Sequence, residues 1–396
     1  RFVGFLQRLK MITEKLYYND SYINEFSAVI LSCDACTDGF FVTLDKTAFF
    51  PEGGGQKADN GYIGDVFVKD VQEESGKILH FVDKALSVGG EYLCKLNWQQ
   101  RFNRMQNHSG EHIVSGIVNS LYGYDNVGFH MEEDYVTIDF NGELTREQLD
   151  EIEDKVNYAI YKNYSINCWF PDQTELSGLD YRSKLELTEN VRLVSIENTD
   201  LCACCAPHVK STGEVGIVKI LDFMRHRGGI RLVMKAGPKA LLDYREKYKS
   251  VYDISNLLSA KQPEVFNAVE RVYNEVDDVN RELYNFKHKV AESDKNNLIY
   301  SGNISYFISS FYDTDMMRNL VNYGMEKSSL SLAFSGEDEN GYSYIAGSNS
   351  LDMKNVARSI NSNLNGRGGG RDTMIQGKVS ATKEQILNYL ENNEWR

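Results

Sequence analysis

The sequence Asn107-His108-Ser109-Gly110-Glu111-His112-Ile113-Val114 opens a segment in which apolar residues recur at helical spacing as far as about Leu121. Residues four apart share one face of an α-helix, so the imidazole rings of His108 and His112 would point toward a common place. Zinc commonly takes two ligands from one element and two from another. The segment therefore predicts a helix that carries half of a metal site.

A second pair of candidate ligands lies in the segment 200–209, which contains three crowded cysteines. Cys204 and His208 are four residues apart, and they offer the sulfur and nitrogen donors that zinc prefers. In a cytosolic chain such a cluster indicates a metal or redox site rather than disulfides. For His80 a buried structural histidine is the better interpretation. Spacing alone leaves further candidate ligands open, which are Cys202, Cys205 and His130.

The two histidines also fit the pattern H-x-x-E-H, in which inverzincin peptidases use the glutamate as general base. That glutamate would be Glu111, and such peptidases take their third ligand from a downstream glutamate, for which Glu189 is available. This alternative gives Cys204 and His208 no role, and the chain is much shorter than those peptidases. A zinc peptidase therefore stays the second enzyme hypothesis.

The 396 residues exceed what one hydrophobic core usually holds, so we expect several domains of mixed α+β class. Residues 25–100 alternate apolar and polar side chains between turn residues, which is typical of a small antiparallel barrel. The last hundred residues alternate strands and helices. The expected parts are a candidate non-native extension before Met11 (1–10), a glycine-rich β-barrel domain (11–100), a zinc-binding α+β domain (101–237), a helical linker or coiled coil (238–297) and a glycine-rich α/β domain (298–396).

Two glycine-rich segments are candidate binding loops. The first contains Gly53, Gly54, Gly55 and Gln56, and its glycines would let backbone amides approach a ligand or a neighbouring helix closely. The second, between expected elements of the C-terminal domain, is predicted to be a loop that cradles phosphate, because arginines flank its glycines. Its residues are Arg367, Gly368, Gly369, Gly370 and Arg371.

Apolar residues at alternating steps of four and three run through 265–290, which predicts a heptad helix. Such a helix forms either a hairpin arm or a coiled coil between two copies of the chain. Two capping boxes, Thr145 with Gln148 and Thr382 with Gln385, predict the starts of two further helices.

The formal net charge of −14 argues against unspecific nucleic-acid binding. It leaves room for two local basic islands, with ten lysines and arginines against four acids in 209–249 and six against one in 353–383. The longest apolar runs are far below the ~18 residues of a membrane helix, and no export signal opens the chain, so we expect a cytoplasmic protein.

Taken together, the motifs resemble those of the editing and C-terminal parts of alanyl-tRNA synthetase and of the free-standing alanyl-tRNA editing proteins called AlaX. The resemblance covers nearly all of 11–396 and leaves no room for an adenylating domain, so the chain is similar to the long AlaX type with a C-terminal glycine-rich domain. The motifs that carry it, in family order, are Thr47-x-Phe49-x-Pro51-Glu52-Gly53-Gly54-Gly55-Gln56, Gln106-Asn107-His108-x-x-x-His112, Cys204-x-x-x-His208-Val209 with Thr212-Gly213-Glu214, and Gly368-Gly369-Gly370-Arg371.

The resemblance implies hydrolysis of the ester that joins a wrong amino acid, chiefly serine and also glycine, to tRNA for alanine. A pocket for alanine cannot strongly reject such small competitors, so a second site must correct the product. By the same analogy zinc is held by His108, His112, Cys204 and His208, while Thr47 contacts the serine hydroxyl and His130 lies near the pocket. Glu111 could assist as base, although the family does not require a glutamate there.

The family's C-terminal domain is linked to tRNA binding, which would give the segment from Arg367 to Arg371 phosphate partners. A homodimer through the 265–290 helix or the C-terminal domain is a further expectation. The alternative outside enzyme chemistry is a tRNA-binding protein that keeps a structural zinc ion and hydrolyses nothing. Zinc is the expected cofactor in either case.

Overall fold

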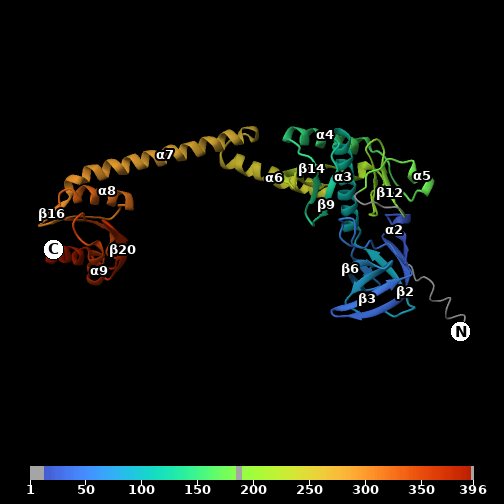
Figure 1. Cartoon of the computed structure of the whole chain (residues 1–396), viewed down its shortest axis with the longest axis horizontal. Helices are drawn as coiled ribbons and strands as arrows, with labels where there is room; N and C mark the ends of the chain where they lie inside the picture. The colour runs from blue at the N-terminus through green and yellow to red at the C-terminus, as the bar shows by residue number, and fades with distance from the viewer. Residues whose placement is uncertain (1–12, 184–189, 394–396) are drawn as a thin grey trace. The chain divides into compact units, whose positions relative to one another are not determined.

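A computed structural model describes residues 13–183 and 190–393 of the chain (Figure 1). The chain divides into two compact units, Arg1–Val251 and Tyr252–Arg396. Several sheets and helices alternate in both, so the predicted mixed α+β class is confirmed. Among the described residues, no helix has both the length and the apolar character that a membrane crossing requires.

The first unit begins with a closed six-stranded barrel in which the strand order is β2-β3-β7-β6-β5-β8. Alternate residues of its strands point into a core that includes Val42, Leu44, Val68 and Val82. Before the barrel, α2 (Leu16–Asn19) follows β1 (Glu14–Lys15), which pairs with β4 (Lys46–Thr47). The barrel strands are β2 (Glu25–Cys36), β3 (Gly39–Leu44), β5 (Gly61–Ile63), β6 (Val66–Glu74), β7 (Lys77–Val82) and β8 (Glu91–Leu96).

Helix α3 (Trp98–Tyr122) rises from one end of the barrel, as Figure 1 shows. The side chain of Asn97 caps its start, and Gly123 ends it in the left-handed conformation with φ of 69°. The apolar spacing predicts the head of this helix near Asn107, and this prediction is wrong by more than two turns. The additional turns form because Met105 and the partly buried Trp98 pack against the core of this unit.

A buried ion pair fastens α3 to the loop that follows the glycine segment. The Arg101 guanidinium donates to the Asp59 carboxylate, with 2.8 Å between Arg101 Nε and Asp59 Oδ2. Both side chains are at most 2% exposed. Arg101 also donates to the backbone oxygens of Ser21 and Ala48, so its guanidinium is held on several sides. The first turn of α3 and the barrel loops therefore form one packed structure.

Beyond α3, the first unit contains a four-stranded sheet and a three-stranded sheet. The capping box of Thr145 and Gln148 is present at the start of α4, as predicted. In order, the elements are β9 (Asn126–Met131), β10 (Val136–Phe140), α4 (Arg146–Lys162), β11 (Ile166–Trp169), α5 (Gln173–Ser177), β12 (Leu193–Ile196), β13 (Asp200–Ala203), the 3₁₀ turn η1 (Thr212–Val215), β14 (Val218–His226) and β15 (Gly229–Ala236).

The predicted helical region is helical in two pieces, α6 (Pro238–Leu257) and α7 (Val265–Asp294), with the 3₁₀ turns η2 (Gln262–Glu264) and η3 (Lys295–Asn297). The second unit continues with a six-stranded sheet whose order is β16-β17-β18-β19-β21-β20. Its elements are β16 (Ile299–Ser301), β17 (Ile304–Ser309), α8 (Thr314–Met325), β18 (Leu330–Glu337), β19 (Gly341–Gly347), α9 (Met353–Asn363), β20 (Gly366–Arg371), β21 (Met374–Val379) and α10 (Lys383–Asn392).

The segment from Arg367 to Arg371 lies in the edge strand β20, so the prediction of a loop is wrong. β20 pairs antiparallel with β21 in one hairpin. A Cβ atom on Gly368 would lie 2.5 Å from Tyr344 Oη, so glycine is needed where the strand passes over the neighbouring strands. Gly368 and Gly370 thus permit close packing of a strand, whereas a Cβ atom on Gly369 would meet nothing within 4 Å. Arg367 and Arg371 are exposed, and strand alternation puts both on the same face as Gly369.

Candidate metal centre

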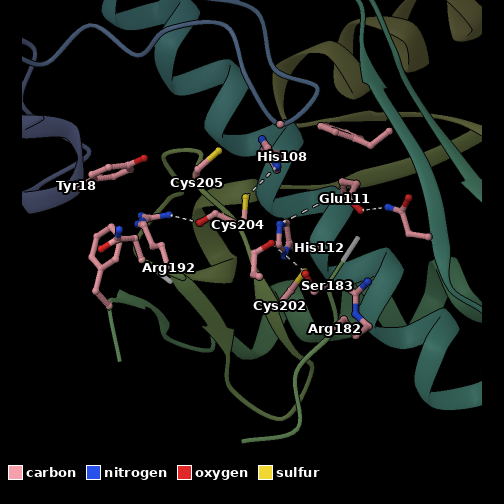
Figure 2. Close-up of a pocket in the computed structure, with 16 residues that line it drawn as sticks. Tyr18, His108, Glu111, His112, Arg182, Ser183, Arg192, Cys202, Cys204 and Cys205 are labelled. Carbon is pink, nitrogen blue, oxygen red and sulfur yellow. Dashed lines mark hydrogen bonds and ion pairs between the residues drawn. The ribbon is translucent and has the colours of Figure 1, made fainter. Parts of the chain in front are cut away.

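Four side chains from two distant segments meet inside the first unit. The ligand atoms of His108, His112, Cys204 and His208 all lie within 4.8 Å of one another. Cys204 Sγ is 3.5 Å from Nε2 of His108 and 3.5 Å from Nε2 of His208. The two histidines of α3 and the loop after β13 thus form a cluster that could bind a metal ion (Figure 2).

A glycine on α3 allows the helix to approach the strand that leads to Cys204. A Cβ atom on Gly116 would lie 2.4 Å from the carbonyl oxygen of Thr199, in the turn before β13. Only glycine permits this backbone distance without a shift. Because Gly116 follows His112 by one helical turn, the close approach brings the second segment to the histidine face of α3.

The second ring nitrogen of each histidine has its own partner. Nδ1 of His108 lies 3.0 Å from Gln56 Oε1, Nδ1 of His208 lies 3.0 Å from Ser109 Oγ, and Nδ1 of His112 lies 3.0 Å from Asp200 Oδ2. Such partners fix the ring orientation and leave Nε2 unprotonated for a metal ion. All three Nε2 atoms can therefore face the cluster at once.

The partner of His112 is itself held. Arg182 donates from Nε and Nη2 to the two oxygens of Asp200, at 2.8 Å each. A bidentate arginine–carboxylate pair has little rotational freedom. Arg182 therefore holds Asp200 in place, and Asp200 in turn fixes the orientation of the His112 ring in the cluster. The sequence analysis did not single out Asp200 or Arg182, because neither belongs to a recognisable ligand spacing.

The predicted glycine segment supplies the partner of His108. Gln56 is fully buried, and its backbone exchanges two hydrogen bonds of 3.0 Å with Gly53, which closes a tight turn. Gly55 has φ of 82°, and a Cβ atom there would lie 2.5 Å from the Phe129 ring. The glycines therefore serve close packing against β9, and this packing aims the Gln56 amide at His108.

Of the three crowded cysteines, Cys204 is the one whose sulfur belongs to the four-residue group within the described part of the chain. Cys205 is exposed at the cavity wall, and Cys202 forms a separate group with His112 and Asp200. Arg192 Nη1 donates to the carbonyl oxygens of Cys204 at 2.9 Å and Ala206 at 2.8 Å. These bonds hold the turn that directs Cys204 inward.

The charges of the cluster act on its candidate ligands in different directions. Burial acts to raise the pKa of the Cys204 thiol, but the facing His108 ring and the hydrogen bonds of the imidazoles outweigh it and hold the pKa well below its ordinary value. Burial acts to lower the pKa of His112, and the Glu111 and Asp200 carboxylates outweigh it in the other direction. Burial lowers the pKa of His208 to about 3. Thiolate and neutral imidazole are the forms that ligate metals, so these directions favour ligation by Cys204 and His208. The raised pKa of His112 favours imidazolium, and a metal ion would have to displace its proton.

Glu111 lies beside the cluster with its two oxygens in different surroundings. Oε1 accepts hydrogen bonds from Ser115 Oγ at 2.6 Å and from Asn126 Nδ2. Oε2 lies 3.8 Å from His112 Nε2, and the residue lines the cavity. The carboxylate is therefore fixed through one oxygen, while the other faces the space beside the cluster.

The cluster opens into a cavity of about 230 Å³. In Figure 2 the cluster residues His108, His112 and Cys204 lie between Glu111 on one side and Tyr18 and Arg192 on the other. Glu111 and Asn126 are at most 5% exposed, whereas Phe170, which also lines the cavity, is 50% exposed. The cavity thus has a buried polar end and an open aromatic end, with the ligand atoms between them.

Three residues weighed in the sequence analysis lie elsewhere in the described structure. Thr47 is buried in β4, where its hydroxyl contacts His80 Nε2 at 2.9 Å, and neither residue lines the cavity. His130 is exposed, because alternation along β9 turns Phe129 inward instead. The Phe129 ring packs 4.8 Å from the His108 ring. Glu189, the third ligand of the peptidase alternative, lies outside the described residues, as does the segment 1–10.

Comparisons with known proteins agree with these features along the chain. Three family models match: class II (A) tRNA synthetases at 6–100, the second additional domain of threonyl and alanyl tRNA synthetases at 191–234, and the DHHA1 domain at 302–393. The alanyl-tRNA editing protein AlaX-L of Pyrococcus horikoshii is 28% identical over 95% of this chain and 97% of its own length.

Two further relatives are of different lengths. The alanyl-tRNA editing protein Aarsd1-A of Xenopus laevis is 27% identical over 92% of this chain and 94% of its own length. An alanine–tRNA ligase of Methanococcus maripaludis is 28% identical over 96% of this chain, which spans only 43% of the ligase. The predicted resemblance is therefore confirmed: along nearly its whole length this chain is similar to the alanyl-tRNA editing proteins.

Proposed function

We propose that the protein hydrolyses the ester that joins serine, and also glycine, to tRNA for alanine, with a zinc ion bound by His108, His112, Cys204 and His208. The observation that carries this proposal is the convergence of these four side chains in one cluster, three of which, His108, His112 and Cys204, line a cavity. Its support from comparison is the full-length similarity to proteins named for alanyl-tRNA editing.

Zinc is the metal that suits this donor set. Three imidazole nitrogens and one thiolate are donors that zinc prefers, whereas magnesium and calcium prefer oxygen. With a coordination position open to the substrate, zinc would supply Lewis-acid chemistry to the ester carbonyl or to a water. The protein's own contribution is to hold the ligands through Gln56, Ser109 and Asp200, so that little reorganisation accompanies binding.

Glu111 is the candidate general base. Ser115 and Asn126 hold Oε1, so Oε2 keeps a fixed direction toward the cavity. From there it can take the proton of an attacking water, and a positioned base of this kind contributes roughly 10²–10⁴-fold to a rate. We assign no direct contact with the substrate to Thr47 or His130, because neither side chain reaches the cavity.

The body of the tRNA is proposed to contact the exposed face of β20. Arg367, Gly369 and Arg371 alternate onto one face of this strand, and Lys378 of β21 lies opposite Arg367. Three cations on one face suit phosphate groups. Alanine at both Arg367 and Arg371 should lower the salt dependence of tRNA binding by about one phosphate contact for each arginine. The exposed Arg281 of α7, changed to alanine, is the matched control.

A second copy of the chain is proposed to cover the heptad seam of α7. Large apolar side chains along this helix are exposed, among them Val276, Val279, Leu283 and Phe286. A seam of this kind is stable when a second helix buries it. Sedimentation of the whole protein should report a dimer, which Val276→Glu should weaken.

The deciding experiment is release of serine from serylated tRNA for alanine by the purified, zinc-loaded protein. We expect faster release than from the same tRNA without protein, and loss of this release when a chelator removes the metal. Tight tRNA binding without release at full zinc occupancy would instead establish the binding protein with a structural zinc ion. Cleavage of peptides with no effect on the tRNA ester would establish the peptidase.

A further inference from the structure

The open end of the cavity is built from aromatic side chains. Phe170, the residue after β11, packs edge-on against Tyr18 of α2, with 5.3 Å between their ring centroids. Both rings line the cavity that contains the ligand cluster. Phe170 is half exposed, although a phenylalanine ring gains free energy from burial. An exposed aromatic ring in the wall of a functional cavity indicates a surface for a flat ligand group.

This aromatic end is held in place by its neighbours. Tyr18 packs against Tyr17 at 4.6 Å, and Tyr17 packs against Phe50 at 5.4 Å, so the ring pair rests on the buried core. The guanidinium carbon of Arg192 lies 5.3 Å from the centre of the Tyr18 ring. A rigid ring binds a flat group at a low cost in conformational entropy.

Arg192 also connects the aromatic end with the metal cluster. Its Nη1 atom donates to the carbonyl oxygens of Cys204 and Ala206, and its own carbonyl oxygen accepts from Cys204 N at 3.0 Å. In Figure 2 the Arg192 side chain lies between Tyr18 and Cys204. A ligand that lies on the aromatic rings is therefore placed at a defined position relative to the cluster.

The two ends of the cavity differ in what they can accept. The end at Glu111 and Asn126 is polar and almost closed to solvent, so it suits a small group such as the side chain and amine of serine. Within the described residues, the exposed aromatic end is the end of the cavity that a tRNA chain can approach. The aminoacyl ester joins the amino acid to the ribose of the terminal adenosine, so the adenine base lies one sugar away from the ester.

We propose that Phe170, supported by Tyr18 and Arg192, stacks against the adenine base of the 3′-terminal nucleotide while the ester lies at the metal cluster. This inference rests on the proposed function and specifies how the end of the tRNA enters the site. Stacking on an aromatic ring tolerates any base, because every base offers a π-face. The ring thus provides affinity and position, and Phe170 is a substrate-binding residue rather than a catalytic one.

The test uses a substrate analogue that the enzyme cannot cleave. In 3′-deoxy-3′-(L-serylamino)adenosine an amide replaces the ester, and calorimetry measures its binding to the zinc-loaded, full-length protein. Phe170→Ala should weaken binding about tenfold, the size expected of one base–aromatic contact. Phe170→Trp should keep wild-type affinity, because it restores a stacking surface. An analogue with the same ribose and serylamino group but no base should bind the wild type and the Phe170→Ala variant equally weakly.

Tyr161→Ala provides the matched control, because Tyr161 is an exposed aromatic residue of α4 that does not line the cavity. It should leave binding of the analogue unchanged. Zinc content, measured on each variant, should equal that of the wild type, so any loss of affinity is assigned to the ring. Equal affinity of wild type and Phe170→Ala for the adenosine analogue would overturn the stacking proposal, as would failure of the wild type to bind it.

Kinetics separate this inference from the proposed function. Phe170→Ala should raise KM for serylated tRNA and leave kcat within about threefold. Serine release with an unchanged KM in Phe170→Ala would overturn the stacking proposal and leave the hydrolase standing. Binding of the analogue that depends on Phe170, in a protein that releases no serine, would overturn the hydrolase and leave the base-binding site standing.

Discussion

The β-barrel and the candidate metal centre each contain buried histidines, and the surroundings of these histidines differ. In the barrel, His80 is fully buried, with Nδ1 at 3.0 Å from the Val42 carbonyl oxygen and Nε2 at 2.9 Å from the Thr47 hydroxyl. In the centre, Nδ1 of each histidine also has a partner, but the Nε2 atoms converge on Cys204. Burial and hydrogen bonding are common to both regions. What distinguishes a candidate ligand is an Nε2 atom aimed at other donors.

Removal of the converging sulfur should produce the largest effect. Cys204→Ala deletes one of four donors, so we expect a loss of zinc affinity greater than the roughly 10–100-fold typical of an outer partner, together with loss of serine release. Zinc per protein, measured by elemental analysis after dialysis, and the release assay check this.

Cys205→Ala is the matched control, because the neighbouring thiol faces the cavity wall and lies outside the four-residue group. It should retain stoichiometric zinc. If Cys205→Ala lost the metal and Cys204→Ala kept it, the assignment of Cys204 rather than Cys205 as the ligand would be wrong.

A substitution beside the donors should separate chemistry from metal binding. Glu111→Gln keeps the shape of the side chain and removes its basicity, so kcat should fall about 10²–10³-fold with zinc content unchanged. Single-turnover release of serine measures this fall. A kcat equal to that of the wild type would remove Glu111 from the mechanism.

A weakened outer partner should have a smaller effect on the metal. Asp200→Asn removes the charge that orients His112 and pairs with Arg182, so zinc affinity should fall about 10–100-fold. Competition with a chromogenic chelator measures the change. Asp154→Asn, at an exposed position of α4, should leave the affinity as it is. An unchanged affinity in Asp200→Asn would mean that convergence alone fixes the ring.

Substitution of His80 should change zinc affinity least. Its effect should appear instead in the pH dependence of the free energy of unfolding. Burial lowers the pKa of His80 to about 4, against an opposing hydrogen bond to Val42. In the unfolded chain His80 therefore binds a proton near pH 6.5, whereas in the folded barrel it stays neutral until about pH 4. His80 thus stabilises the fold above about pH 6.5, and this contribution, about 3 kcal/mol at most, is lost as the pH falls to about 4.

His80→Gln should accordingly make the acid dependence of the free energy of unfolding shallower between pH 6.5 and 4, with zinc affinity unchanged. Urea titrations of wild type and variant at a series of pH values measure both slopes. Parallel slopes would show that His80 titrates alike in the folded and unfolded chain. If His80→Gln lost zinc, His80 would belong to the metal centre, and the distinction between a structural and a ligating histidine would be wrong.

The sequence predicts the parts of the centre that depend on short spacing. His108 with His112 and Cys204 with His208 were each recognisable because four residues bring side chains to one face or one turn. Asp200 and Arg182 were not assigned roles, and Gln56 was predicted only as part of a candidate binding loop. Their partners lie in other elements, and no local pattern records a contact over such separations.

The incorrect predictions have equally local causes. Glycines flanked by arginines predict a loop, whereas β20 needs glycine at position 368 to pass close to Tyr344. The head of α3 carries Trp98, Phe102 and Met105 at steps of four and three, a helical spacing that the prediction missed. The error at β20 arises where a tertiary contact, rather than local preference, selects the conformation.

The buried pair of Asp59 and Arg101 limits how modular this protein can be. All four candidate ligands lie in 101–237, so that fragment looks like a portable metal-binding module. Excision would leave Arg101 without its carboxylate, a loss that typically costs ~3–5 kcal/mol, and would deprive His108 of Gln56. The barrel is therefore an integral part of the candidate centre. A transplant into another protein would have to include the barrel together with residues 101–237.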